Sequence, residues 1–146
     1  INDLKIILKE LKLNYIQLHG KENNDYILNI KRELDIKIIK AISVKEKKDI
    51  EDINKYPDAD YLLFDYKPNK TEQPGGNAKS FDWNILKNLK IDKPWFISGG
   101  INKDNISYIL NNLNPYGIDI SSGVEDIPGI KSNEKIIDIM RLLNEK

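Results

Sequence analysis

The fold is decided by residues 94–123, which read PWFISGGINKDNISYILNNLNPYGIDISSG. Two short apolar segments, 94–97 and 116–120, have the length and character of strands, and each runs into serine and glycine. Between them, residues 104–113 carry Ile106, Ile109 and Leu110 on one helical face. Because a helical crossover returns the second strand beside the first in the same direction, the stretch predicts a parallel strand–helix–strand unit.

The same alternation extends toward both ends of the chain. Further strands are predicted at residues 15–18, 37–42 and 61–64, and further helices at residues 4–11, 26–34, 50–56, 82–89 and 134–144. Short apolar strands that alternate with helices are typical of an α/β fold with a parallel sheet. No linker or low-complexity segment interrupts the pattern, so we expect a single domain over residues 1–146.

The residues that end the strands favour a (βα)8 TIM barrel over an open sheet. Polar residues or glycine follow every predicted strand: His19-Gly20, Ser43, Asp65, Ser98-Gly99-Gly100 and Ser121-Ser122-Gly123. Barrel active sites are assembled at this end from several strands, whereas the GxGxxG motif of an open dinucleotide-binding sheet is absent. A complete barrel has eight units, so five parallel strands predict an incomplete barrel, and we expect three β/α units to be missing upstream.

Composition narrows the classes of function. The 146 residues carry 23 basic and 23 acidic side chains, and this zero net charge argues against a general nucleic-acid binder. No apolar run approaches the roughly 20 residues that span a bilayer, so we expect no membrane partner. The absence of cysteine excludes a disulfide framework and favours a cytoplasmic protein. The single histidine, His19, leaves no histidine cluster for a metal site.

The glycines after the last two strands predict a phosphate site. A phosphate needs several backbone N–H donors without a side chain in the way, and barrels frequently place such a site after their last two strands. Gly99 and Gly100 follow one of these strands, and Ser121, Ser122 and Gly123 follow the other. The alternative is that these glycines only form tight strand–helix turns.

Asp65 ends an apolar strand and is therefore expected at the mouth of the barrel, where a carboxyl group can act as a general acid or base. The alternative is a structural carboxylate that caps the next loop. That loop, residues 67–80, is long and contains Gly75 and Gly76, which suits either a lid or a plain surface loop.

Three further positions have less specific predictions. His19 could contact a substrate, although a lone histidine is more often structural. Asp119 lies within the last strand, where it could face the interior and bind a sugar hydroxyl or orient the neighbouring serines. Asp82 and Trp83 are expected to be structural, as a helix cap and a core anchor.

Taken in order, these motifs resemble phosphoribosylanthranilate isomerase, the tryptophan-biosynthesis enzyme with a (βα)8 barrel. The motifs are IQLHGKE (16–22), IKAI (39–42), LLFD (62–65), Gly75-Gly76 followed by FDW (81–83), ISGGI (97–101), IDISSGVE (118–125), and Pro128-Gly129 with Lys131. The resemblance implies an aldose–ketose isomerisation of N-(5-phosphoribosyl)anthranilate without metal or organic cofactor. It also implies that Asp65 is the general acid and that Gly99, Gly100 and Ser121 to Gly123 hold the substrate phosphate.

Three departures from the family pattern limit what these residues are expected to do. The family base is a cysteine in an early Lys-x-Cys-Gly strand, and an early arginine receives the anthranilate carboxylate; nothing here matches either residue. The loop after the third strand also has Ala78 where the family has a third glycine. We therefore expect an isomerase that is inactive as given and that is completed by a missing N-terminal segment or by another chain.

Two alternatives remain open. The chain could be a non-catalytic phosphate-binding half-barrel that associates with another chain. It could also be another phosphosugar enzyme, such as a relative of indole-glycerol-phosphate synthase, although the QLHG motif (17–20) and Asp65 weigh against this.

Overall fold

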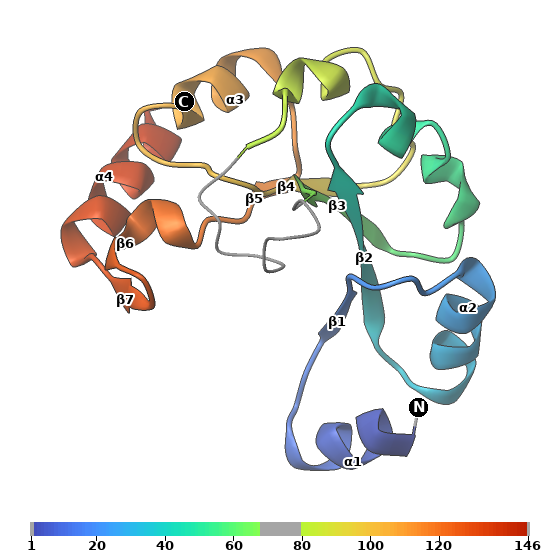
Figure 1. Ribbon diagram of the computed structural model, residues 1–146. Coiled ribbons are helices and arrows are strands. Elements are labelled where there is room, and N and C mark those ends of the chain that lie inside the picture. The colour runs from blue at the N-terminus through green and yellow to red at the C-terminus, as the bar shows by residue number, and fades with distance from the viewer. Residues whose placement is uncertain (1, 68–79, 146) are drawn as a thin grey trace.

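The computed structural model describes residues 2–67 and 80–145, and its centre is one parallel sheet (Figure 1). The strands follow one another in the sheet in chain order: β1 (Tyr15–Leu18), β2 (Lys37–Val44), β3 (Tyr61–Tyr66), β4 (Trp95–Ile97) and β5 (Gly117–Ile118). Every neighbouring pair is parallel. The predicted α/β fold with five parallel strands is confirmed.

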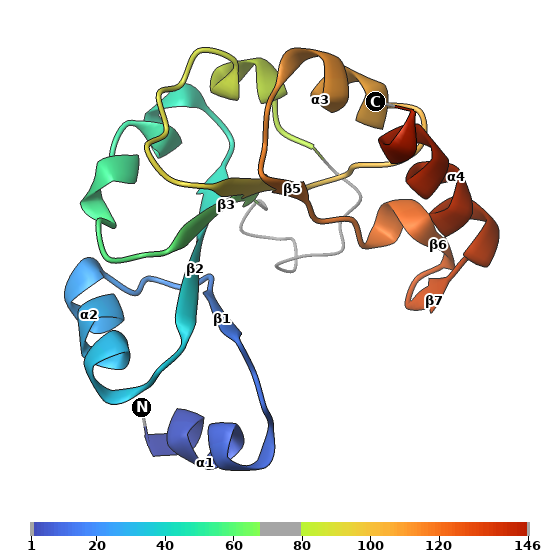
Figure 2. The same ribbon diagram turned by 180° about the vertical axis from the view of Figure 1, so that it is seen from behind.

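The helices lie on the convex side of the curved sheet, as both ribbon views show (Figures 1 and 2). The α-helices are α1 (Asn2–Glu10), α2 (Asn24–Glu33), α3 (Ile106–Asn112) and α4 (Asn133–Asn144). Helices α1 and α4 stand at opposite ends of the arc. In the described part of the chain, β1 and β5 each have a single strand neighbour, so the sheet has two free edges. No helix there is long and apolar enough to cross a membrane.

Two predicted helices are instead short 3₁₀ helices, and the prediction of α-helix at 50–56 and 82–89 was wrong. The structure has η1 (Lys47–Ile50) and η2 (Ile53–Lys55) in the first region and η3 (Trp83–Leu86) in the second. The apolar side chains in each region recur at intervals of three, at 50, 53 and 56 and at 83, 86 and 89. A 3₁₀ helix has 3.0 residues per turn, so this spacing aligns its side chains on one face. The pattern identified the buried face correctly but not the helix type.

A small hairpin near the C-terminus was not predicted. Strands β6 (Glu125–Ile127) and β7 (Ile130–Lys131) pair antiparallel, immediately after the 3₁₀ helix η4 (Ser122–Val124). The turn between them contains Gly129 at φ 85°, a backbone conformation that glycine adopts without strain. The hairpin lies beside α4 at one end of the arc (Figure 1).

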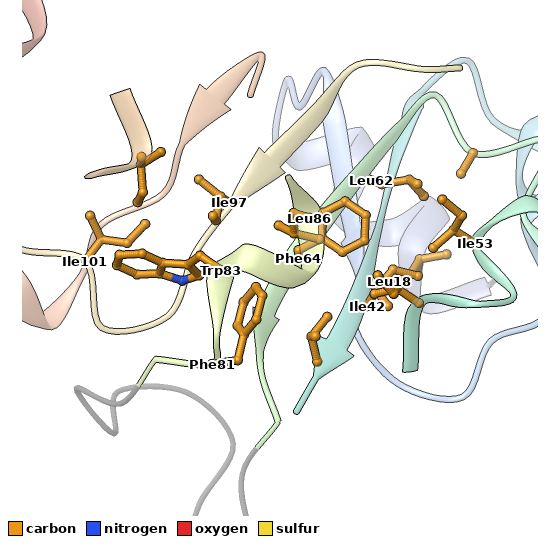
Figure 3. Packing of buried hydrophobic residues seen from close by; sticks show 14 of the residues in the cluster. Leu18, Ile42, Ile53, Leu62, Phe64, Phe81, Trp83, Leu86, Ile97 and Ile101 are labelled. Carbon is orange, nitrogen blue, oxygen red and sulfur yellow. The ribbon is translucent and has the colours of Figure 1, made fainter. Parts of the chain in front are cut away.

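The two faces of the sheet have different cores, because successive strand residues point to opposite faces. On the convex face, Ile42, Phe64 and Ile97 pack with residues of the helical layer such as Trp83 and Leu86 (Figure 3). On the concave face, four aromatic rings meet with centroids 5.6–5.7 Å apart: Tyr15, Tyr61, Phe96 and Tyr116. These rings occupy the amino ends of the strands and leave the carboxyl ends to polar side chains.

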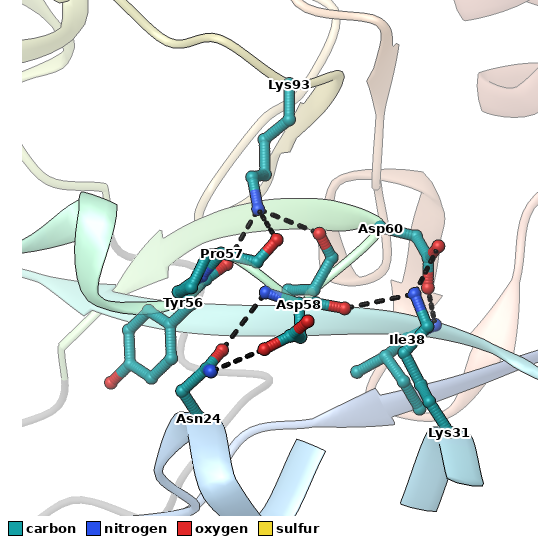
Figure 4. Close-up of polar contacts among 9 residues, drawn as sticks. Asn24, Lys31, Ile38, Tyr56, Pro57, Asp58, Asp60 and Lys93 are labelled. Carbon is teal, nitrogen blue, oxygen red and sulfur yellow. Dashed lines mark hydrogen bonds and ion pairs between the residues drawn. The ribbon is translucent and has the colours of Figure 1, made fainter. Parts of the chain in front are cut away.

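A polar network ties the loops together at the amino ends of the strands (Figure 4). The ammonium of Lys93 donates to the backbone carbonyls of Tyr56 (2.7 Å), Pro57 (3.1 Å) and Ala59 (2.8 Å). Asp60 accepts from the backbone N–H of Ile38 at 2.8 Å. Burial lowers the pKa of Lys93, because the charged form loses solvation. The three carbonyl contacts offset that loss and fix the path of the chain into β3.

Lys93→Met is expected to lower the free energy of unfolding by about 1–3 kcal/mol, because three carbonyl groups lose a charged donor. Urea unfolding followed by circular dichroism measures the change. Lys90→Met is the matched control, since Lys90 is an exposed lysine three residues away. Equal unfolding midpoints for the two variants would contradict the assigned role of Lys93.

Candidate active site at the carboxyl ends of the strands

The predicted site residues gather on the concave face at the carboxyl ends of the strands. Asp65 lies within β3, in register with Ser43 of β2. Alternation along β3 places Asp65 on the same face as Tyr61, whose ring belongs to the concave cluster. Asp119 follows β5, and its backbone N–H continues the ladder by donating to Ile97 O at 2.9 Å. The parallel sheet therefore brings together side chains that lie more than fifty residues apart in sequence.

The Asp65 carboxylate is half-buried and is held from one side. Its Oδ1 atom accepts from the backbone N–H of Tyr66 at 2.8 Å. Gly99 lies against it: a Cβ atom at Gly99 would be 3.3 Å from Asp65 Oδ1 and 3.0 Å from the Tyr66 nitrogen. Gly99 also has φ +94°, so a side chain there would be both strained and crowded. The first predicted phosphate loop thus packs directly on the predicted acid.

The second predicted phosphate loop packs on the first through its backbone. A Cβ atom at Gly123 would lie 1.8 Å from the carbonyl oxygen of Ile101, so only glycine fits this contact. A cavity of about 380 Å³ lies where the loops meet, and its lining includes Gly100, Ser122 and Gly123. The cationic side chains of Lys103 and Lys135 also line it. The two loops are adjacent as expected, and phosphate binding by them stays a prediction.

Asp119 is the carboxyl group of this site with a raised pKa. The largest cause of the raised pKa is burial of the Asp119 carboxyl group, and the negative charge of Asp65 raises the pKa further. The positive charge of Lys131 acts in the opposite direction. The side chain is nonetheless open to solvent in the described part of the chain, so water screens part of these effects. Asp65 and Asp119 are therefore two carboxyl groups close enough to affect each other.

The raised pKa of Asp119 predicts a pH-dependent stability. A carboxyl group whose pKa is higher in the folded state stabilises the protein below its unfolded pKa, and this contribution is lost as the pH rises through the folded pKa. Asp119→Asn should therefore be more stable than the unaltered chain at neutral pH, with a difference that shrinks in mild acid.

Urea unfolding midpoints at several pH values test this expectation for Asp119. Asp35→Asn, which removes a carboxyl group at an exposed position outside the site, is the control for the loss of one negative charge. A constant midpoint difference between Asp119→Asn and the unaltered chain across the pH range would refute the expectation.

His19 directly follows β1, with its side chain exposed. Alternation from Tyr15 places it on the concave side of the sheet. The loop that carries it is organised by Lys40, which is 1% exposed and was missed in the sequence. The Lys40 ammonium donates to Leu18 O (3.3 Å), Gly20 O (2.9 Å) and Glu22 Oε2 (2.9 Å). A lysine inside an otherwise apolar strand was the signal available for finding it.

Asp82 and Trp83 have the structural roles that the sequence predicts. The Asp82 side chain caps η3 by accepting from the Asn84 N–H at 3.0 Å, and Trp83 is buried, so the structural assignment of both is confirmed. The predicted lid with Gly75, Gly76 and Ala78 lies outside the described residues. Lys131, a residue of the Pro128-Gly129 motif, lies beside Ser121 at the second predicted phosphate loop.

Comparison with known proteins agrees with this architecture. The family model described as N-(5'phosphoribosyl)anthranilate (PRA) isomerase matches residues 1–141. The N-(5'-phosphoribosyl)anthranilate isomerase of Rhizobium rhizogenes is 40% identical over 137 residues, which are 92% of this chain and 62% of that protein. The protein of the same name from Brucella canis is 45% identical over 127 residues, or 86% of this chain and 57% of that protein.

Solved structures show the same relationship. The phosphoribosyl anthranilate isomerase of Thermotoga maritima aligns with a TM-score of 0.83 and 28% identity, covering 99% of this chain and 68% of that one. The Thermus thermophilus structure aligns with a TM-score of 0.78 and 28% identity, with the same coverages. The chain spans about 60% of the length of the curated relatives that it matches. From the family match over residues 1–141 and the shared arrangement of strands, the chain belongs to the N-(5'-phosphoribosyl)anthranilate isomerase family.

Proposed function

We propose that this chain carries the phosphate-binding site and the general acid of a phosphoribosylanthranilate isomerase, a cytoplasmic enzyme of tryptophan biosynthesis. The observation that carries the proposal is the contact between Gly99 and Asp65. A sugar whose phosphate is bound at the glycine loops would lie close to Asp65, because Gly99 packs on the Asp65 carboxylate. A homologous structure with 25% identity and a TM-score of 0.77 contains reduced 1-(o-carboxyphenylamino)-1-deoxyribulose 5-phosphate, which supports a phosphosugar ligand.

In this proposal the backbone N–H groups of Gly99, Gly100, Ser122 and Gly123 bind the 5-phosphate. Their donors are preorganised, because both loops are fixed by close backbone packing. The ribose ring then lies over the carboxyl ends of the strands, where Asp119 can accept a hydrogen bond from a sugar hydroxyl. His19 lies at the rim of the same face and would contact the substrate from the β1 side.

Asp65 supplies the proton that opens the ribose ring. As the bond between C1 and the ring oxygen breaks, Asp65 protonates that oxygen, and the anthranilate nitrogen forms an imine with C1. Removal of the C2 proton then moves the double bond and leads to the ketose. The chain has no cysteine, so the family base for this second step is not among these 146 residues. We therefore propose that these residues bind the phosphosugar but do not isomerise it alone.

Reconstitution tests the proposal. The chain would be co-expressed with the part of the Rhizobium rhizogenes isomerase that lies outside the match, and turnover followed by the loss of phosphoribosylanthranilate fluorescence. We expect turnover by the reconstituted protein and none by either part alone. No turnover by a reconstituted protein that assembles and binds ribose 5-phosphate would refute the assignment of the acid to this chain.

A second candidate is a non-catalytic phosphate-binding half-barrel that associates with another chain. The observation in its favour is the exposed apolar surface at both ends of the arc, at Ile6, Ile7 and Leu11 on one end and Ile137 and Met140 on the other. Sedimentation velocity separates the candidates. A stable homodimer that binds phosphate, together with failed reconstitution of turnover, would favour this second function.

A further inference from the structure

Lys131 connects the C-terminal hairpin to the second phosphate loop. Its ammonium donates to the carbonyl oxygen of Ser121 at 3.0 Å and to the Ser121 hydroxyl at 3.0 Å. It also forms an ion pair of 2.6 Å with Glu125 Oε1. The hairpin turn between β6 and β7 brings Lys131, ten residues further along the chain, back to the end of β5.

The number of contacts identifies how Lys131 acts. A lysine ammonium has three N–H donors, and the two Ser121 oxygens and Glu125 use all three. None is left to bind a ligand oxygen in this arrangement. Lys131 is therefore better suited to hold the loop than to contact a phosphate directly.

The Glu125 carboxylate that holds Lys131 is itself held on its other side. The Oε2 atom of Glu125 accepts from the backbone N–H of Gly129 at 3.2 Å. The backbone carbonyl of Glu125 accepts from the Lys135 ammonium at 2.6 Å. The hydrogen bond from Lys131, then that from Gly129, lowers the pKa of Glu125 and so favours its carboxylate form. The hairpin thus presents Lys131 to Ser121 in a defined geometry.

The contact with Ser121 orients the backbone that follows. The Ser121 carbonyl also accepts from the N–H of Val124 at 3.2 Å, which closes the 3₁₀ turn η4. Ser122 and Gly123, the two residues whose N–H groups are proposed to bind phosphate, lie inside this turn. Fixing the Ser121 carbonyl and hydroxyl therefore fixes the direction of both N–H groups.

We infer that Lys131 is a positioning residue of the phosphate site: through its two hydrogen bonds to Ser121 it orients the turn formed by Ser121, Ser122 and Gly123. This inference rests on the proposed function, because it assumes that the turn binds phosphate. It gives a role to the hairpin that follows residues 118–125 and that carries Pro128, Gly129 and Lys131 of the resemblance. The hairpin is the element that returns the lysine to the strand end.

Phosphate titration of the isotope-labelled chain tests the inference, with inorganic phosphate as the probe and amide nuclear magnetic resonance as the readout. In the unaltered chain, phosphate should shift the amide signals of Gly99, Gly100, Ser122 and Gly123. In Lys131→Met, affinity should fall roughly tenfold, because a charged contact to the turn is lost. The shifts at Ser122 and Gly123 should weaken more than those at Gly99 and Gly100, a split that general destabilisation would not produce.

Two further variants complete the design. Lys131→Arg should recover most of the affinity, because a guanidinium can reach the same oxygens, whereas Lys9→Met on α1 removes one charge far from the site and should have no effect. Equal phosphate affinity in Lys131→Met and the unaltered chain would overturn the inference alone, and so would an equal loss in Lys9→Met. If phosphate shifts none of the four amides in the unaltered chain, the phosphate site of the proposed function itself is wrong.

Discussion

Asp65→Asn is expected to reduce isomerisation by the reconstituted enzyme by about 10²- to 10⁴-fold while leaving phosphate binding intact, because general acid catalysis contributes a factor of this size. Asparagine has the shape of aspartate and retains an oxygen that can accept from the Tyr66 N–H, the 2.8 Å contact that orients the side chain. Gly99 packs on this same oxygen, so the first phosphate loop should also keep its place. The substitution therefore removes the transferable proton and little else.

Steady-state kinetics and ribose 5-phosphate titration measure the two halves of this prediction separately. A fall in kcat with unchanged ligand affinity and an unchanged unfolding midpoint assigns Asp65 to the chemical step. Asp82→Asn, at the cap of η3 on the convex side, is the matched control and should keep full turnover. Turnover by Asp65→Asn within tenfold of the unaltered enzyme would instead show that Asp65 is a structural carboxylate of the β3 end.

The strands and their polar ends could be predicted from sequence because they follow simple local rules. An apolar run such as Tyr61–Phe64, bounded by polar residues, is compatible with a buried parallel strand and with little else of that length. Once the strands are parallel, their carboxyl ends must share one edge, so the meeting of Asp65, Gly99 and Gly123 follows from topology alone. The close contacts at Gly99 and Gly123, which leave no room for a side chain, could not be predicted, because they depend on the distances between loops.

The elements that were missed depend on features without a distinct sequence period. Apolar residues at every third position, as at Ile50, Ile53 and Tyr56, lie on one face of an α-helix as well as of a 3₁₀ helix, so this spacing does not exclude either helix type. The hairpin strands β6 and β7 are two or three residues long and largely exposed, so they carry no apolar alternation. Lys131 could be placed beside Ser121 only after this hairpin was known.

Lys40 was missed for a different reason, since a charged residue in a strand usually marks a solvent-exposed face. Here it lies on the convex face of β2, buried under the β1–α2 loop, with the ring of Tyr56 5.6 Å from its ammonium.

The ion pair between Lys40 and Glu22 depends on pH. Partial burial tends to raise the pKa of Glu22, but the hydrogen bond from Lys40, backbone N–H groups and the Lys40 charge together lower it. The lowered pKa of Glu22 means that this ion pair stabilises the fold at neutral pH. The contribution is lost as the pH falls through the lowered pKa, below the ordinary range of glutamic acid.

Lys40→Met is therefore expected to be among the most destabilising substitutions in the chain, at about 3 kcal/mol. Methionine fills a similar volume, but the carbonyls of Leu18 and Gly20 lose their donor and Glu22 is left without its counter-ion. The value lies at the lower end of the range for broken buried pairs, because a quarter of the Glu22 side chain remains exposed to water. Urea unfolding at neutral pH measures the loss, and Lys48→Met, in the exposed pair with Glu46, is the control that should leave the midpoint unchanged.

A second variant separates the lost ion pair from lost packing. If the cost arises from an uncompensated charge, adding Glu22→Gln to Lys40→Met should recover part of the stability, so the two changes together cost less than their sum.

The effect on the site can be followed directly, because His19 is the single histidine of the sequence and its imidazole resonances need no assignment. We expect these resonances to move in Lys40→Met, since the loop on which His19 sits loses the contacts at Leu18 and Gly20 that fix it. Strict additivity of the two substitutions, together with unmoved His19 resonances, would show that Lys40 contributes packing alone and does not organise this side of the site.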